Sequence, residues 1–174
     1  MKGIKKPANL DDLRLGVQTI LAEFQKSFEH PEDDWPNAMF FWHNPEDGVN
    51  VMEIPNFMFA NHESKNIVAN ILKTILVTED VVRFVLCMNV HGVRTQPDDE
   101  TMERVNREEI RIQQLPGAYE MLTLTVVDAE EEQMWMAEIE RPDGLPPRLK
   151  EWERLPKDVR LSGRFAGWSE ILRA

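Results

Sequence analysis

The chain has 174 residues, of which 42% are hydrophobic and 29% charged, proportions typical of a folded protein with a buried core. Asp and Glu total 31 against 20 Lys and Arg, and the resulting formal charge of −11 repels a phosphate backbone, which argues against direct nucleic-acid binding. The single cysteine, Cys87, excludes an internal disulfide and indicates a reducing compartment, so we expect a cytoplasmic protein. Lysines at the start have no apolar stretch behind them and Arg83 interrupts the most apolar run, so we expect neither a signal peptide nor a membrane span.

The N-terminal third predicts a helix followed by a β-hairpin. Asn9 is suited to cap a helix over 10–28, because its side chain can accept a hydrogen bond from the first turn. One face of that helix is apolar: Leu10, Leu13, Val17, Ile20, Leu21, Phe24 and Phe28. Residues 38–43 and 49–54 are typical of two strands, joined by a turn that contains Asn, Pro, Asp and Gly.

Residues 61–94 predict a helix and then a central strand. Six apolar residues are spaced to form one buried helix face: Ile67, Val68, Ile71, Leu72, Ile75 and Leu76. Residues 81–90 are almost continuously apolar and rich in β-branched and aromatic types, which indicates a strand buried on both faces in the middle of a sheet. We expect this helix, docked on this strand, to form the centre of the core.

The second half of the chain predicts two further strands and a tail. Apolar residues in 95–118 fit neither the helix nor the strand period, so helix and irregular strand both stay open there. Strands are expected at 119–127 and 133–141, and a tail at 142–174 in which Trp152 and Trp168 pack on the body. The predicted class is α+β: an antiparallel sheet of about five strands, two main helices packed against it and an irregular C-terminal tail. We expect one domain over 1–174, with its core at 9–141.

Two resemblances follow from this layout. The element order resembles that of roadblock or profilin-like domains, which implies an α+β fold and no particular function. The second is carried by 65–90 and by three short sequences: Pro-Gly-Ala-Tyr-Glu-Met-Leu at 116–122, Ala-Glu-Ile-Glu-Arg at 137–141 and Ser-Gly-Arg-Phe at 162–165. Together these resemble a group of small bacterial, phage and plasmid proteins without an assigned activity, which implies a phage or mobile-element origin.

No motif in the sequence predicts catalysis. His62 and Glu63, at the start of a helix, are placed like the ligand helix of zinc deaminases, but the His-x-Glu spacing and the Pro-Cys-x-x-Cys sequence are missing. Cys87 and His91 share a strand face but lie ~13 Å apart, which excludes a thiol–imidazole dyad. We therefore expect no cofactor and no metal, and the protein is more consistent with a non-enzyme. A metal-dependent hydrolase using His43, His62 and His91 stays open as an alternative, although no HxH or HExxH spacing occurs.

Two groups of polar residues are candidate binding surfaces. Arg83, Asn89 and His91 point to one face of the central strand and form a possible polar pocket or partner surface, unless the strand ends simply carry Arg83 and His91 into solvent. Nine acidic residues form three triplets: Glu32, Asp33, Asp34, Asp98, Asp99, Glu100, Glu130, Glu131 and Glu132. Carboxylates spaced like phosphates suggest a nucleic-acid mimic that inhibits a DNA- or RNA-binding protein, but two triplets flank strand 119–127 at opposite ends.

The strand at 133–141 suggests a partner. Trp135 lies between Met134 and Met136, so both faces of this strand are apolar and need cover from a helix, the tail or a second subunit. The leading hypothesis is a non-enzymatic interaction or regulatory protein with a protein partner, possible as a homodimer. The mimic and the small hydrolase are the alternatives.

Overall fold

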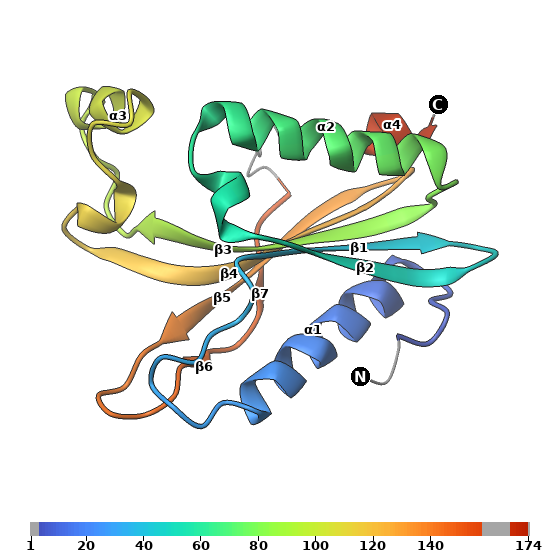
Figure 1. Cartoon of the computed structure of the whole chain (residues 1–174), viewed down its shortest axis with the longest axis horizontal. Helices are drawn as coiled ribbons and strands as arrows, with labels where there is room; N and C mark the ends of the chain where they lie inside the picture. Colours follow the sequence, from blue (N-terminus) through green and yellow to red (C-terminus); the bar gives the residue numbers. More distant parts are fainter. Residues whose placement is uncertain (1–3, 158–167, 174) are drawn as a thin grey trace.

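The computed structural model describes residues 4–157 and 168–173, and within these ranges it shows a seven-stranded antiparallel sheet with four α-helices (Figure 1). The strand order is β2-β1-β3-β4-β5-β6, and β7 also pairs with β5. The main strands are β1 (Ala38–Asn44), β2 (Gly48–Ile54), β3 (Arg83–Val93), β4 (Ala118–Asp128) and β5 (Glu132–Glu140). The predicted α+β class and antiparallel sheet are confirmed. The two additional strands, β6 (Arg148–Leu149) and β7 (Glu153–Arg154), come from the tail.

Helix α1 (Leu10–Lys26) covers one face of the sheet (Figure 1). The predicted cap is present, since the Asn9 side chain accepts a 2.9 Å hydrogen bond from the Asp12 amide. The apolar stripe of α1 packs on inward-facing side chains of β1, β3 and β4, with Phe24 and Phe28 partly buried at its end. The buried helix residues are Leu10, Leu13, Val17, Ile20 and Leu21.

Helix α2 (His62–Thr78) covers the opposite face, together with the short helix α4 (Ser169–Arg173) (Figure 1). Asn61 caps α2 by accepting a hydrogen bond from the Ser64 amide. Helix α2 buries Val68, Ala69, Leu72 and Leu76 against the sheet. The prediction that Ile67 and Ile71 belong to the buried face is wrong, because both lie in the exposed part of the helix surface.

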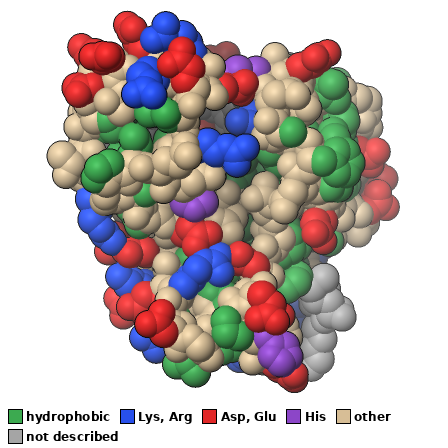
Figure 2. Space-filling model, turned by 60° about the vertical axis from the view of Figure 1, so that its left-hand side comes forward, with side chains coloured by type: hydrophobic (Ala, Val, Ile, Leu, Met, Phe, Trp, Pro, Cys, Tyr) green, Lys and Arg blue, Asp and Glu red, His purple; other side chains and the backbone are tan. Residues whose placement is uncertain are grey.

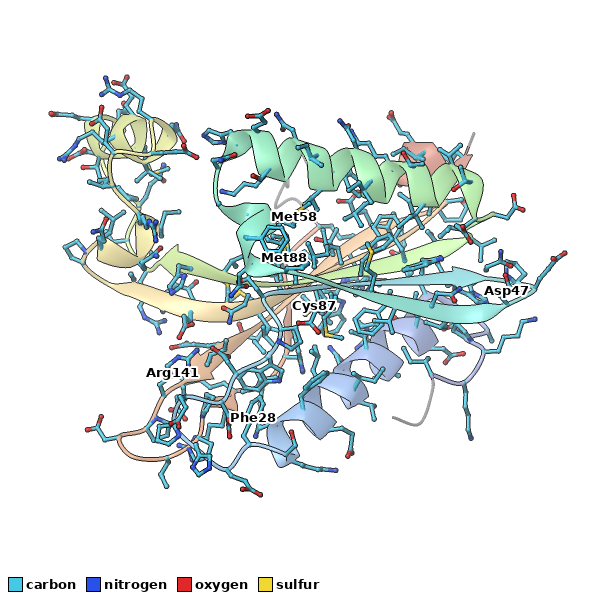
Figure 3. The ribbon with its side chains drawn as sticks, viewed as in Figure 1. Phe28, Asp47, Met58, Cys87, Met88 and Arg141 are labelled. Carbon is cyan, nitrogen blue, oxygen red and sulfur yellow. The ribbon has the colours of Figure 1, made fainter. Side chains whose placement is uncertain are left out.

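Strand β3 lies between β1 and β4, so the prediction of a central strand is confirmed. Val85 and Cys87 face α1, whereas Phe84 and Leu86 face α2, and all four are buried. Figure 3 shows this alternation one residue further along, with Cys87 on the α1 side of the sheet and Met88 on the α2 side. The last six residues of β3 are only half-buried, so the double cover applies to its first half.

The segment 95–118, which the sequence left open, forms helix α3 (Asp99–Asn106) and the 3-10 turn η2 (Ile112–Gln114). Asp98 caps α3 by accepting a 2.7 Å hydrogen bond from the Thr101 amide. None of the α3 residues is buried, and the helix stands away from the sheet beyond the end of β3 (Figure 1). The start of α3 is therefore stabilised by a local cap and not by packing against the sheet.

The tail is held by tryptophans, as predicted. Trp152 packs against the core on the α1 side, and Trp168 is buried on the α2 side. The expected irregular structure is wrong for two dipeptides, which pair with β5 as β6 and β7, and for 169–173, which form α4. The Ser-Gly-Arg-Phe sequence at 162–165 lies outside the described residues.

Candidate functional site

The structure places the predicted polar residues of β3 at two separate positions. Arg83 begins the strand, where its Nη1 donates a 2.9 Å hydrogen bond to the Pro7 carbonyl and lies 3.3 Å from His43 Nδ1. Asn89 lies six residues further along β3, roughly 20 Å away at the rise of a strand. The structure thus groups Asn89 with His91 and leaves Arg83 with His43.

His91 belongs to an ion-pair network that joins β3, β4, the end of β5 and the loop before β1. His91 Nε2 lies 3.9 Å from Glu120 Oε1, and Arg141 binds both Glu120 and Asp34, the latter at 2.6 Å. Figure 3 labels Arg141. The Arg141 hydrogen bonds hold the pKa of the Glu120 carboxyl below its usual value against the opposing effect of burial. Both carboxylates bind the Arg141 guanidinium, so this network ties these elements together through charge-assisted hydrogen bonds.

The histidines of the alternative hydrolase do not form a shared site. His43 is level with Arg83 in the β1–β3 register, so it lies near the opposite end of β3 from His91. His62 is in the first turn of α2, 3.4 Å from Glu108. Within the described ranges there is no group of three His, Cys, Asp or Glu side chains placed to hold a metal ion.

The acidic triplets have local partners. Asp33 accepts hydrogen bonds from the Glu29 and His30 amides, which lower its pKa, and Asp98 caps α3. Glu131 pairs with Arg154 at 3.5 Å. Residues 98–100 precede β4 and residues 130–132 follow it, so roughly 35 Å of strand separates these two triplets. Their carboxylates therefore do not line one continuous surface.

Trp135 receives its cover from α1. The Arg14 guanidinium lies 4.0 Å from the Trp135 ring centroid, and the indole N–H donates a 3.0 Å hydrogen bond to the Gln133 side chain. Met134 and Met136, on the other face of β5, are half-buried. The α1 side of this strand therefore needs no second subunit.

A different surface stands out once the fold is known: beyond the first turn, the exposed positions of α2 are uncharged, and the one charged residue there, Lys73, is half-buried with its Nζ 5.6 Å from the Trp168 ring centroid. Its exposed residues are Asn66, Ile67, Asn70, Ile71, Thr74, Val77 and Thr78. Ile67 is 48% exposed, Ile71 43% and Val77 68%. Helix α1 differs, since its exposed positions include Asp11, Asp12, Glu23 and Lys26. Charged residues normally occupy the solvent side of a surface helix, so the composition of α2 is unusual in a chain this acidic.

An apolar groove continues this surface from α2 to strand β2 through the 3-10 turn η1 (Asn56–Phe59). The groove has a volume of about 160 Å³ and its lining is apolar except for Glu53: Met52, Glu53, Ile54, Pro55, Phe57, Met58, Val68, Ile71 and Leu72. Phe57 stands beside it with 71% of its surface exposed. Figure 2 shows hydrophobic side chains gathered at the upper right, whereas the upper left is crowded with acidic and basic ones.

Strand β2 borders the groove and forms an edge of the sheet. Its seven residues pair one-to-one with β1 without a bulge, and the strand contains neither Lys nor Pro. Within the described ranges no strand pairs with its outer side. Lys, Pro and bulges, which keep many edge strands from pairing with another chain, are missing from β2, and its one charged residue is Glu53.

We call this surface the α2–β2 face and define it by Met52, Phe57, Ile67 and Ile71. Val51, which pairs with Phe41, points to the α1 side of the sheet and belongs only to the edge of β2. Sequence reasoning missed the α2–β2 face, although the sequence contains a signal. At about 100° per residue, the six apolar residues of α2 extend over about 180° of the helix, wider than the ~100° stripe that one sheet contact requires. The part of the apolar surface of α2 that exceeds this width carries Ile67 and Ile71, the two exposed residues of the six.

Comparison of this chain with protein-family models, curated proteins and solved structures found no match. None of the helices in the described ranges is long and apolar enough to cross a membrane. The site must therefore be interpreted from its own geometry.

Proposed function

We propose that this chain is a non-enzymatic interaction protein that binds a protein partner through the α2–β2 face. The single observation behind the proposal is the absence of charge on the exposed side of α2, next to an apolar groove. Cores of protein interfaces are depleted in charged residues, and contiguous exposed apolar surface is uncommon where nothing binds.

The contrast with the rest of the surface supports this assignment. The charged side chains of Glu120, Arg141 and Asp34 contact one another within the chain and join β4, the end of β5 and the loop before β1. The α2–β2 face, in contrast, leaves Phe57 71% exposed and Ile67 48% exposed. A partner that removes these side chains from water gains roughly 25 cal/mol for each Å² of apolar surface it covers.

Site-specific photo-crosslinking tests the proposal. A photoreactive amino acid at Ile71, in the chain expressed in its own host, is expected to give discrete crosslinked species that contain a defined protein. The matched control is the same amino acid at Leu15, which is 51% exposed on α1 and lies on the opposite side of the sheet. Equal crosslinking at both positions, or none at Ile71, contradicts the proposal.

A second test places charge on the face. Ile71→Glu is expected to abolish the crosslinked species obtained from a probe at Ile67, whereas Leu15→Glu leaves them unchanged, because only the first substitution puts a carboxylate into the interface. Thermal unfolding of both variants verifies that the fold is retained. Retention of the same species in Ile71→Glu argues against the α2–β2 face as the binding surface.

A further inference from the structure

We propose that the partner on the α2–β2 face is a second copy of this chain, joined by antiparallel pairing of β2 with β2 of the other copy about a twofold axis at Val51. This inference rests on the proposed function and names the occupant of the same face. It predicts one continuous sheet across the two copies, with strand order β3-β1-β2-β2-β1-β3 at its centre.

The charge distribution favours a second copy as the occupant. Each chain carries a formal charge of −11, so two copies repel one another over most of their surfaces. The α2–β2 face is a surface where they can meet without opposing carboxylates, since its exposed helix positions are uncharged. A basic partner recognised by electrostatic complementarity would instead match the acidic loops, and homodimer interfaces are more apolar than those of transient complexes.

The sequence of β2 is compatible with pairing to itself. With Val51 opposite Val51, the antiparallel register places Val49 opposite Glu53 and Asn50 opposite Met52. The one charged residue of the strand, Glu53, therefore never faces its own copy, and no like charges oppose each other. The one-to-one register with β1 shows that β2 has no bulge to interrupt pairing with a strand on its outer side.

The same symmetry brings α2 into the interface. A twofold axis perpendicular to the sheet keeps each face of the sheet on its own side, so the two α2 helices lie on the same face of the joined sheet. Ile71 contributes to the groove that borders β2, and this side of α2 is therefore turned toward the axis and toward the other copy. Strand pairing and helix contact bury the α2–β2 face together, and the exposed positions of α2 beyond its first turn, which this contact covers, are uncharged.

Disulfide trapping tests the register directly. Residues directly opposite in an antiparallel pair have Cα atoms about 4.5–5.5 Å apart, within the range that a disulfide spans, so Val51→Cys is expected to form a covalent dimer under mild oxidation. The native Cys87 does not compete because it is buried. Glu53→Cys is the register control on the same strand face: two such cysteines lie four residues apart in register, ~13 Å, and are expected not to crosslink. Leu15→Cys controls for random collision.

Native mass spectrometry and sedimentation of the unmodified full chain provide the second readout. The expected result is a monomer–dimer equilibrium that Ile71→Glu weakens about tenfold or more and Leu15→Glu does not change. Crosslinking of Glu53→Cys as fast as Val51→Cys, or failure of Val51→Cys to crosslink, overturns the register. A chain that stays monomeric over the micromolar range overturns the second-copy inference. If Ile71 probes then still crosslink to another protein, the proposed function survives, whereas their failure removes both.

Discussion

At the residue scale, His43 is the histidine with the most distinctive environment. Its ring is buried at the end of β1, beside the Arg83 guanidinium. Burial, and then the positive charges of Arg83 and Lys6, hold the pKa of His43 below its ordinary value of about 6.5. In the folded chain this histidine therefore stays neutral at pH values at which it is protonated in the unfolded chain.

This environment predicts how stability depends on pH. Because the folded pKa of His43 is the lower one, the unfolded chain binds the additional proton first, and the free energy of unfolding falls as pH drops from about 6.5 toward the folded pKa. The slope from one such group is at most about 1.4 kcal/mol per pH unit. Urea unfolding between pH 8 and pH 5 is expected to show a shallower loss of stability for His43→Gln than for the unmodified chain.

The control for His43 is the exposed His30, in the loop after α1. His30→Gln removes an exposed histidine and leaves the buried His43 in place. The free energy of unfolding of this variant is therefore expected to change with pH as it does in the unmodified chain. If His43→Gln and the unmodified chain lose stability in parallel, protonation of His43 does not contribute to unfolding at acid pH.

Cys87 supports a second prediction at this scale. It is buried between β3 and α1, and burial raises the pKa of its thiol to about 12 (Figure 3). Because the thiolate is the reacting species, the native chain is expected not to react with a chromogenic disulfide reagent at pH 8, whereas the chain in urea releases one equivalent. Rapid reaction of the native chain would place Cys87 at the surface and contradict a β3 covered on both faces.

At the element scale, one side of helix α2 packs against the sheet and the other side is exposed, and two adjacent residues lie on different sides. Leu72 is fully buried against the sheet, whereas its neighbour Ile71 is 43% exposed. Leu72→Ala is expected to lower the free energy of unfolding by about 2–5 kcal/mol, the usual effect of a large cavity in a core. Ile71→Ala, which leaves no closed cavity, is expected to lower it by less than about 1 kcal/mol. Urea denaturation of both variants measures the difference, and equal losses would mean that Ile71 belongs to the core.

The same helix shows where prediction from sequence succeeded and where it failed. Apolar periodicity identified α1 and its buried residues, because the stripe of α1 is as wide as the sheet surface that it covers. For α2 the same periodicity included Ile67 and Ile71, because a pattern records which residues are apolar and not where the neighbouring strands end. Strand β2 ends the sheet on that side, and the excess apolar width of α2 projects past the covered area.

Other elements were unpredictable for physical reasons of their own. Strands β6 and β7 have two residues each, too short to show any period. They form because β5 offers free backbone groups: the Lys150 amide donates to the Glu138 carbonyl at 2.9 Å, and the Leu155 amide to the Met134 carbonyl at 2.9 Å. The candidate site could not be predicted from the sequence either. The absence of charge on the exposed side of α2 is not a motif, and it can be recognised only when the buried residues of the helix are known.

At the scale of the whole molecule, the exposed side of α2 is free of acidic residues beyond its first turn, and Glu53 is the one acidic residue that lines the groove beside it. Asp33 accepts hydrogen bonds in the loop after α1, Asp98 caps the start of α3, and Glu120 and Asp34 are bound by Arg141. The charge of −11 is therefore carried mainly outside the proposed contact between two copies, which is largely apolar and surrounded by surface of like charge.

This arrangement makes the salt dependence of self-association diagnostic. Two copies at −11 repel each other through solvent, and sodium chloride shortens the range of that repulsion from about 10 Å at 0.1 M to about 3 Å at 1 M. Because the contact itself lacks ion pairs for salt to weaken, the dimer is expected to tighten as sodium chloride rises, with Kd measured by sedimentation equilibrium. Binding of a basic partner to the acidic loops would show the opposite trend, since salt screens attraction between unlike charges. A dimer that dissociates as salt is added would therefore be held by ion pairs, and the uncharged α2–β2 face would not be its interface.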